Sequence, residues 1–174
     1  FTPVFFDAWM RLLKAVDGSV LWIVASDDVV RANLEAEAKS RGVDSGRLIF
    51  AKRVSLEDHL ARHVHADLLL DNLPYNAHTT TSDALWSGVP VVTCMGQAFA
   101  GRVAASLLNA VGLSELVTHS EAEYEALAFR LATNPSELQR LRAHLRSVRA
   151  HAPLFDTERF TQHLETAYLH MHER

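Results

Sequence analysis

Residues 71–106 read DNLPYNAHTTTSDALWSGVPVVTCMGQAFAGRVAAS, and this stretch decides the fold. An apolar run, Ala66–Asp71, leads into it and ends in a carboxylate, and the turn-rich segment Asn72–Ala77 follows. The polar run His78–Asp83 then opens a helix, after which comes a second apolar strand, Val89–Cys94. A strand, a loop, a helix and another strand in this order predict a parallel βαβ unit, and hence an α/β fold.

The polar run at the start of this helix contains more hydroxyl groups than a helix cap needs. Backbone N–H groups in the first turn of a helix have no partner within the helix, and with several hydroxyls they make a site for a phosphate or diphosphate. The alternative is that one of these Thr or Ser residues is only an N-cap. Because one hydroxyl is enough for a cap, the unbroken run from His78 to Asp83 favours the anion site.

The alternation of short apolar strands and helices continues outward in both directions. The expected strands are Val20–Ala25, Arg47–Lys52, Ala66–Asp71, Val89–Cys94 and Leu116–Thr118. The expected helices are Pro3–Val16, Val29–Arg41, Leu56–His63, Thr79–Ser87, Gln97–Val111, Glu121–Thr133, Pro135–His151 and Asp156–His172. This pattern predicts one α/β domain over residues 1–174, a parallel sheet between two layers of helices, with C-terminal helices at about 121–174.

Three loops follow strands of the expected sheet, at Lys52–Ser55, Asn72–Thr81 and Met95–Ala98. Because the carboxyl ends of parallel strands lie at one edge, we expect these loops to converge on a nucleotide-sized ligand. The chain has neither GxGxxG nor GxxxxGK[ST], so neutral donors would hold the phosphates. Asp83 lies about one helical turn after the first threonine of the run. Its carboxylate either accepts hydrogen bonds from ribose hydroxyls or only complements the helix dipole.

The composition argues against several other classes of function. The chain has 174 residues and a formal net charge of −4, which disfavours nucleic acid and anionic membranes as partners. The basic residues of Leu138–Arg149 have the spacing of a solvated helix face. Cys94, the only cysteine, is expected to be a buried thiol. No motif indicates a metal site or a hydrolase, and no signal peptide or membrane-length apolar run is found, so we expect a reducing, cytoplasmic setting.

The central block resembles the C-terminal catalytic half of the bacterial-type O-linked N-acetylglucosamine transferases, glycosyltransferase family 41. The resemblance is carried by PYNAHTTTSDALWSGVPVVT, residues 74–93, and GQAFAGRVAASLL, residues 96–108, and is weaker toward both ends. It implies a Rossmann-like three-layer domain, the C-terminal half of a GT-B-type glycosyltransferase. It also implies transfer of N-acetylglucosamine from UDP-N-acetylglucosamine (UDP-GlcNAc) to Ser or Thr hydroxyls of proteins, without a metal or another cofactor.

The resemblance assigns the start of the central helix to the donor. It implies that His78, Thr79 and Thr80 bind the donor diphosphate and that Asp83 binds the ribose. Thr81 is given a supporting role. Hydrogen-bond donors at this helix end would stabilise the negative charge that builds on the β-phosphate as the sugar–phosphate bond breaks.

The resemblance assigns the base of the nucleotide to the segment LEDHLAR. It implies that His59 stacks on the nucleotide, that Arg62 contacts the uracil and that the backbone at Val54 reads the uracil edge. From spacing alone, the pair at positions 59 and 62 is most often a solvated helix surface. The animal members of the family have Lys where Leu56 stands, so a ribose or phosphate contact is absent here or supplied differently. Arg102 is expected to support the donor pocket.

The resemblance further implies that this chain is half of an enzyme. The N-terminal half of the same enzyme would supply the remaining catalytic and acceptor contacts, including a lysine that aligns just before Phe1. No catalytic residue is therefore assigned within the chain, and the isolated chain is expected to be inactive.

Three other functions stay open. A sister branch of the family uses GDP-fucose, and there the helix start reads Gly-Thr-Thr-Thr-Thr with Glu at the position of Asp83. Residues His78 and Asp83 favour the N-acetylglucosamine type. A UDP-sugar epimerase of the same two-domain fold would need carboxylates in its cleft, for which Asp71 and Asp83 are the candidates. The third alternative is a nucleotide-sugar-binding module without catalysis.

Overall fold

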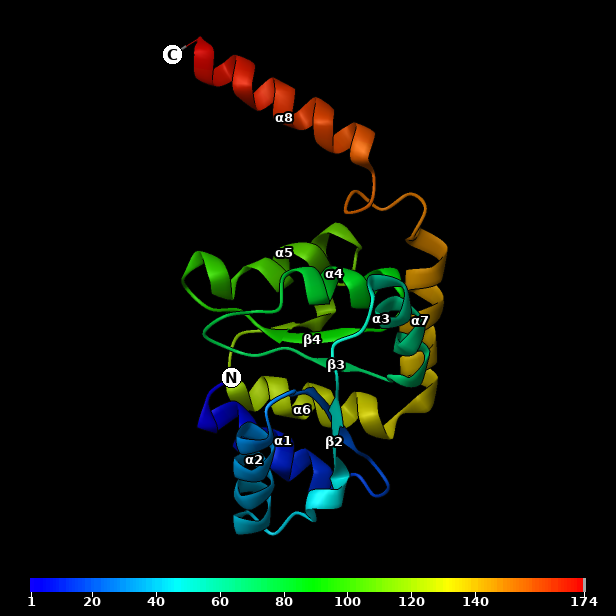
Figure 1. The fold of residues 1–174 in the computed structure, drawn as a ribbon. Coiled ribbons are helices and arrows are strands. Elements are labelled where there is room, and N and C mark those ends of the chain that lie inside the picture. The colour runs from blue at the N-terminus through cyan, green and yellow to red at the C-terminus, as the bar shows by residue number, and fades with distance from the viewer. Residues whose placement is uncertain (174) are drawn as a thin grey trace.

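The computed structural model describes residues 1–173, in which strands and helices alternate along the chain (Figure 1). The strands are β1 Leu21–Val24, β2 Leu48–Ala51, β3 Leu69–Leu70, β4 Val91–Cys94 and β5 Val117–Thr118. The helices are α1 Pro3–Ala15, α2 Asp28–Ser40, α3 Leu56–Arg62, α4 Thr79–Trp86, α5 Val103–Ala110, α6 Glu121–Thr133, α7 Pro135–Val148 and α8 Thr157–His172. The predicted α/β fold with parallel strands is confirmed.

The strands form two hydrogen-bonded sheets within residues 1–173, where the sequence predicted one. Strand β4 lies between β3 and β5, and β1 pairs with β2 over four residues. Every strand pair is parallel. Strand β3 is shorter than the expected Ala66–Asp71, because a run of apolar residues reports burial and not hydrogen-bond pairing. Both of its ladder residues pair with β4, and within residues 1–173 no ladder joins β3 to β1.

Strand β4 is the centre of the larger sheet. All four of its residues are buried, as expected for a parallel strand covered on both faces. Helices α4 and α5 lie on one side of it and α6 on the other, with α1 packed against α6 (Figure 1). The sheet is therefore enclosed by helices near the segment that the sequence marks as the site.

Tyr124 links α6, the sheet and α1 inside the core. Its side chain on α6 is fully buried, and its ring packs edge-on against Phe5 of α1. The indole N–H of Trp9 donates to the Tyr124 hydroxyl at 3.0 Å. The hydroxyl in turn donates to the backbone carbonyl of Asp71 at 2.7 Å. This chain of hydrogen bonds connects α1 to the end of β3, directly before the candidate site.

Local sequence signals explain most of the helix ends. Asp27 caps α2, and Ser55 caps α3 by accepting from the backbone N–H of Asp58, which confirms the predicted S-x-x-D cap. The predicted helix Gln97–Val111 was too long at its start. Residues 99–101 form a short 3-10 turn, and α5 begins only at Val103. The reason is a backbone bond from the N–H of Gly96 to the carbonyl of residue 101, at 2.7 Å, which closes this segment into a loop.

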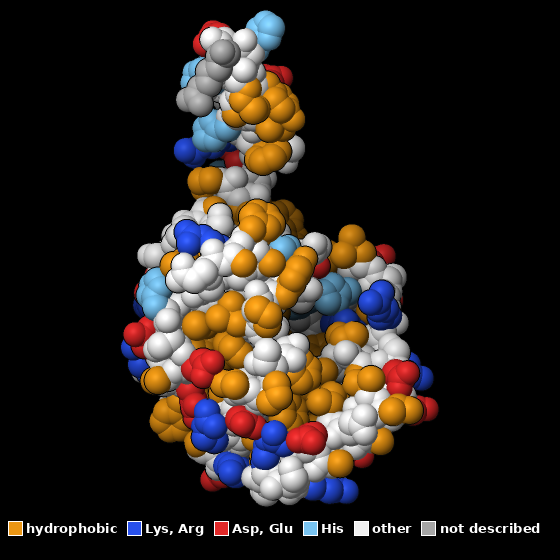
Figure 2. Space-filling model, turned by 90° about the vertical axis from the view of Figure 1, so that its left-hand side faces the viewer, with side chains coloured by type: hydrophobic (Ala, Val, Ile, Leu, Met, Phe, Trp, Pro, Cys, Tyr) orange, Lys and Arg blue, Asp and Glu red, His pale blue; other side chains and the backbone are white. Residues whose placement is uncertain are grey.

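Helix α8 extends away from the rest of the chain (Figures 1 and 2). None of its residues is buried. Its exposed apolar side chains include Phe160, Leu164, Tyr168 and Met171, whose spacing places them along one side of the helix. No helix within residues 1–173 combines the length and the apolar character that crossing a membrane requires.

Replacing Tyr124 by Phe is expected to lower the free energy of unfolding by about 1–3 kcal/mol, because it leaves the Trp9 N–H and the Asp71 carbonyl buried without a partner. Urea denaturation of the purified protein measures this. Tyr168→Phe, at an exposed position of α8, is the matched control and should change the free energy little. Equal stability of the two variants would contradict the structural role of the Tyr124 hydroxyl.

Candidate functional site

The first turn of α4 presents backbone N–H groups and threonine hydroxyls at the carboxyl end of the sheet. His78 is the N-cap residue, and its side chain makes no capping bond. The first helical bond runs from the Ser82 N–H to the His78 carbonyl, at 3.1 Å. The alternative that a Thr or Ser serves only as the N-cap is therefore wrong. Thr79 and Thr80 are exposed in the first turn, whereas Thr81 is buried.

Thr81 differs from the two threonines before it. Its side chain is fully buried, and its hydroxyl oxygen has no hydrogen-bond partner within residues 1–173. Thr81 therefore faces the interior, one helical position beyond the exposed pair, and its expected supporting role stays a prediction.

Asp71 fastens the loop that leads into α4. Its buried carboxylate accepts from the backbone N–H of Ala77 at 2.7 Å and from the Thr93 hydroxyl on β4 at 2.6 Å. Burial raises the pKa of the Asp71 carboxyl above its usual value, and these two hydrogen bonds oppose the shift. Both oxygens are engaged, so Asp71 positions the helix start and does not face a ligand.

The loops after β3 and β4 lie directly against each other. The backbone N–H of Asn76 donates to the Ala100 carbonyl at 2.9 Å. A Cβ atom added at Gly101 would lie 3.1 Å from the Pro74 carbonyl oxygen, closer than side-chain carbons normally approach. Glycine at position 101 is therefore required by the close approach of the two loops, which holds the start of α4 in place.

His78 is held between aromatic rings at this junction. Its ring stacks on Tyr75, with centroids 4.7 Å apart, and lies edge-on to Phe99 at 6.2 Å. Its Nε2 atom lies 3.3 Å from the Ala100 carbonyl oxygen. Both aromatic side chains are largely exposed, so they border the site. Neither Tyr75 nor Phe99 was predicted as a site residue from the sequence. Their positions within the two loops that precede α4 and α5 were the available signal.

The loop–helix segment after β2 reaches the same region through α3. His59 Nε2 lies 3.6 Å from a carboxylate oxygen of Asp83. The Arg62 guanidinium lies 2.8 Å from His59 Nδ1, and because Arg can only donate, Nδ1 is the acceptor and the proton of the neutral ring is on Nε2. That proton faces Asp83. Residues 24 positions apart in the sequence thus form one polar group.

The protonation of His59 follows from its surroundings. Burial lowers the pKa of His59 below its usual value, and the nearby His63 and Arg62 lower it further, while the Asp83 carboxylate raises it. The neutral ring is therefore the prevailing form at pH 7. A neutral ring presents a flat face without the cost of burying a charge, which suits stacking on a base.

Arg62 connects this group to the loop after β2. It donates to the Lys52 carbonyl at 2.9 Å, and its guanidinium lies over the Trp22 ring at 5.3 Å. The predicted loop at residues 52–55 is thus connected through α3 to α4, which follows the loop after β3. The segment after β4 reaches the loop after β3 through the bond from Asn76 to Ala100. Val54 is exposed in the first loop, and Arg102 is exposed at the N-cap of α5. The hydrogen bonds and ion pairs of residues 1–173 do not join these two side chains to the others.

The chemistry available at this site is binding by neutral donors next to one carboxylate. In the part of the chain that the structure describes, no group of three or more His, Cys, Asp or Glu residues is arranged to hold a metal ion. Cys94 is buried, and burial raises the pKa of its thiol, so it is not poised as a nucleophile. The first turn of α4 can hold an anion, and Asp83 can accept hydrogen bonds from hydroxyl groups.

Comparison with known proteins identifies the family and relatives of this chain. The family model described as glycosyl transferase family 41 matches residues 1–164. A probable UDP-N-acetylglucosamine–peptide N-acetylglucosaminyltransferase SEC of Arabidopsis thaliana is 38% identical over 97% of this chain. The corresponding transferase of Caenorhabditis elegans is 34% identical over 94% of it. The chain spans only 17% and 14% of the length of these two relatives.

A solved structure shares the fold as well as the sequence. A mutant of the Thermobaculum terrenum O-GlcNAc transferase superposes with a TM-score of 0.93 at 38% sequence identity. The match covers 98% of this chain and 34% of that one.

Replacing Asp83 by Asn is expected to lower the pKa of His59 further, because it removes the carboxylate that raises it. An NMR titration of the His59 ring should give a midpoint below 6.5 in the unaltered protein and a lower one in the variant. The same shift makes the folded state less stable as the pH falls through 6.5, since unfolded His59 takes up its proton first.

The control for this titration is Asp58→Asn, on the same helix, whose carboxylate bonds to Ser55. It should leave the His59 midpoint unchanged. A midpoint that is the same in the Asp83→Asn variant and the unaltered protein would contradict the placement of these two side chains.

Proposed function

The chain belongs to glycosyl transferase family 41, and from this premise we propose that it is the donor-binding half of a GT-B-type enzyme. The enzyme transfers N-acetylglucosamine from UDP-GlcNAc to Ser or Thr hydroxyls of proteins. The relatives named as UDP-N-acetylglucosamine–peptide transferases support this donor and this class of acceptor. Because the chain spans about a sixth of their length, the activity belongs to the longer protein and the isolated chain is inactive.

One observation carries the proposal: the uncapped first turn of α4, with exposed Thr79 and Thr80, lies next to the polar group formed by His59 and Asp83. An anion at the helix end would be held by backbone N–H groups and hydroxyls, since the helix dipole is positive there. The carboxylate of Asp83 lies one turn further along the same helix. This arrangement suits a ligand that has a diphosphate joined to a hydroxyl-bearing sugar.

The first turn of α4 would bind the leaving diphosphate. As the sugar–phosphate bond breaks, charge builds on the β-phosphate, and the N–H groups and the hydroxyls of Thr79 and Thr80 stabilise it without reorganising. His78 is oriented toward the same region by Tyr75 and by the Ala100 carbonyl, and it contributes a further contact. No metal ion or other cofactor takes part in this proposal.

The nucleoside would lie between α3 and α4. The Asp83 carboxylate accepts hydrogen bonds from the ribose hydroxyls, and it is oriented by the Nε2–H of His59. His59 stacks on the uracil, Arg62 contacts the base, and the backbone at Val54 reads its edge. Arg62 is held in place by the Lys52 carbonyl and by the Trp22 ring, so that its position is set before the ligand arrives.

The rest of the enzyme would complete the site. The N-terminal half of the protein supplies the catalytic and acceptor contacts, and protein substrates are the further partners. Helix α8 projects from the rest of the chain, and its apolar side chains are exposed. Each relative compared above is longer than this chain. We place the enzyme in the cytoplasm, consistent with a single, buried, unpaired cysteine.

The open alternatives are less well supported by the site. An epimerase would need several carboxylates in its cleft, and Asp71, one of two candidates, is buried with both oxygens engaged. A GDP-fucose transferase would have Gly and Glu at the positions that His78 and Asp83 occupy.

Replacing Thr79 and Thr80 together by Val tests the proposal. Transfer of N-acetylglucosamine to a protein acceptor by the full-length enzyme should fall on the order of 10²-fold, because donors aimed at developing charge are lost. Thr133→Val is the matched control, since that hydroxyl bonds only to carbonyls of its own helix α6. Unchanged transfer in the double variant would refute the role of this helix start.

A further inference from the structure

A polar cavity lies at the opposite end of α4 from the proposed donor site. It has a volume of about 350 Å³ and is bounded by α3, α7 and the turn after α4. Because α4 has eight residues, its two ends are about 12 Å apart. The cavity is therefore a different place from the helix start that holds the diphosphate in the proposed function.

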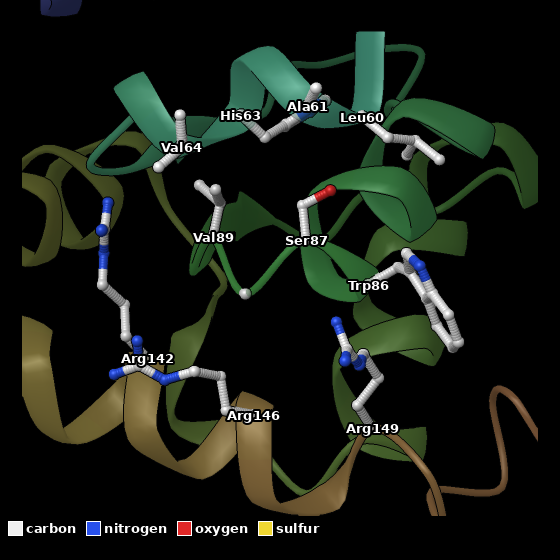
Figure 3. Close-up of a pocket in the computed structure, with 11 residues that line it drawn as sticks. Leu60, Ala61, His63, Val64, Trp86, Ser87, Val89, Arg142, Arg146 and Arg149 are labelled. Atoms are coloured by element: carbon white, nitrogen blue, oxygen red, sulfur yellow. The ribbon is translucent and has the colours of Figure 1, made fainter. Parts of the chain in front are cut away.

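Three arginines line this cavity: Arg142 and Arg146 of α7, and Arg149, which directly follows that helix (Figure 3). Their spacing of four and three residues puts them on one face of the helix. The sequence predicted a solvated face for the basic residues of this helix, and this is confirmed for Arg140, Arg146 and Arg149, which are exposed, whereas Arg142 is half-buried. Arg140 lies on the opposite face and pairs with Glu115.

The positive charge of the cavity is poorly balanced by the protein. Within residues 1–173, only Arg142 has a carboxylate partner, Asp67, at 3.4 Å, and the Asp67 side chain is largely exposed. No ion pair of Arg146 or Arg149 is found in that part of the chain. The Nε atom of Arg142 is buried and has no hydrogen-bond partner there. Neighbouring like charges on one helix face repel each other, and a bound anion would relieve this repulsion.

Two of the three arginines, Arg142 and Arg149, are held in place before any ligand binds. Arg142 donates to the backbone carbonyl of Ala66. The guanidinium of Arg149 lies over the Trp86 ring at 5.1 Å, and Phe155 packs edge-on against that ring at 5.0 Å. The stem of Arg146 passes the turn at Gly88. The guanidinium groups of Arg142 and Arg149 are held by these contacts, and groups held in this way lose little freedom when they bind an anion.

The remaining wall of the cavity is apolar. Leu60, Val64 and Val89 line it opposite the arginines, and the Trp86 ring is partly exposed at its edge (Figure 3). A bare phosphate ion would fill only a small part of the volume and would leave this wall in water. The combination of guanidinium groups with an apolar wall fits an organic phosphate whose body packs on the hydrocarbon side.

We propose that the cavity between α3, α4 and α7 binds a small, soluble organic phosphate, with its phosphate group on Arg146 and Arg149 and its apolar part against Val64, Val89 and Trp86. This site does not depend on the proposed donor function. Phosphate is favoured over a single carboxylate because it offers more oxygens and more charge to several guanidinium groups.

Calorimetric titration of the full-length protein with phenyl phosphate and with inorganic phosphate tests this proposal. UDP is kept at a saturating concentration so that any donor-site binding is excluded, and the titration is repeated without UDP. We expect phenyl phosphate to bind more tightly than inorganic phosphate. Arg146→Gln combined with Arg149→Gln should weaken phenyl phosphate binding at least tenfold, and Arg140→Gln should leave it unchanged.

Two further measurements keep the outcome unambiguous. Thermal melting must show that the double variant is folded as well as the Arg140→Gln control. The indole N–H signal of Trp86 should shift on titration in the unaltered protein and not in the double variant. Absence of phenyl phosphate binding at physiological salt, or equal binding by the double variant and Arg140→Gln, would overturn the proposal. Either result would leave the donor function untouched.

Discussion

The buried carboxylate of Asp71 is the interaction on which the rest of the site depends. One oxygen accepts from β4 through the Thr93 hydroxyl, and the other accepts from the Ala77 N–H in the loop before α4. The backbone carbonyl of the same residue accepts a hydrogen bond from the hydroxyl of Tyr124 on α6. A single residue thus connects the sheet, the loop and the covering helix. The direction in which α4 presents its first turn follows from these bonds.

Two further constraints align the loops around that helix start. Glycine at position 101 lets the loop after β4 approach the loop after β3, so that Asn76 can bond to Ala100. On the other side, α3 reaches α4 through the contact between His59 and Asp83. These constraints therefore place the first turn of α4, the Asp83 carboxylate and the His59 ring in one region. In the proposed function, this region would hold its ligand by position more than by net charge.

The fold could be predicted from the sequence wherever local signals are strong. Apolar runs predicted β1, β2 and β4, and side-chain caps such as Ser55 predicted the helix starts. The parallel pairing of β3 with β4 was predicted from the βαβ pattern, but the division of the strands into two sheets was not, because the leucines before Asp71 indicate burial and do not show whether a second strand pairs with them. The late start of α5 was missed because it depends on a backbone bond between Gly96 and residue 101, which no residue type announces.

The candidate site was predictable only in part, for a related reason. The hydroxyl run at residues 79–81 is local, so its place at a helix start followed from the sequence. The contact of His59 with Asp83, the stacking of Tyr75 on His78 and the cavity beside α7 arise from tertiary packing between distant segments. The helical spacing of the arginines could be predicted from the sequence, but the apolar wall of the cavity opposite them could not. The sequence therefore predicted a solvated helix face.

The most direct test of the central claim is a calorimetric titration of UDP and of GDP into the full-length protein and its Asp83→Ala variant. The account predicts that UDP binds more tightly than GDP and that the variant loses UDP affinity by at least tenfold, while its folding is unchanged. Tighter binding of GDP, or UDP binding that does not depend on Asp83, would contradict it.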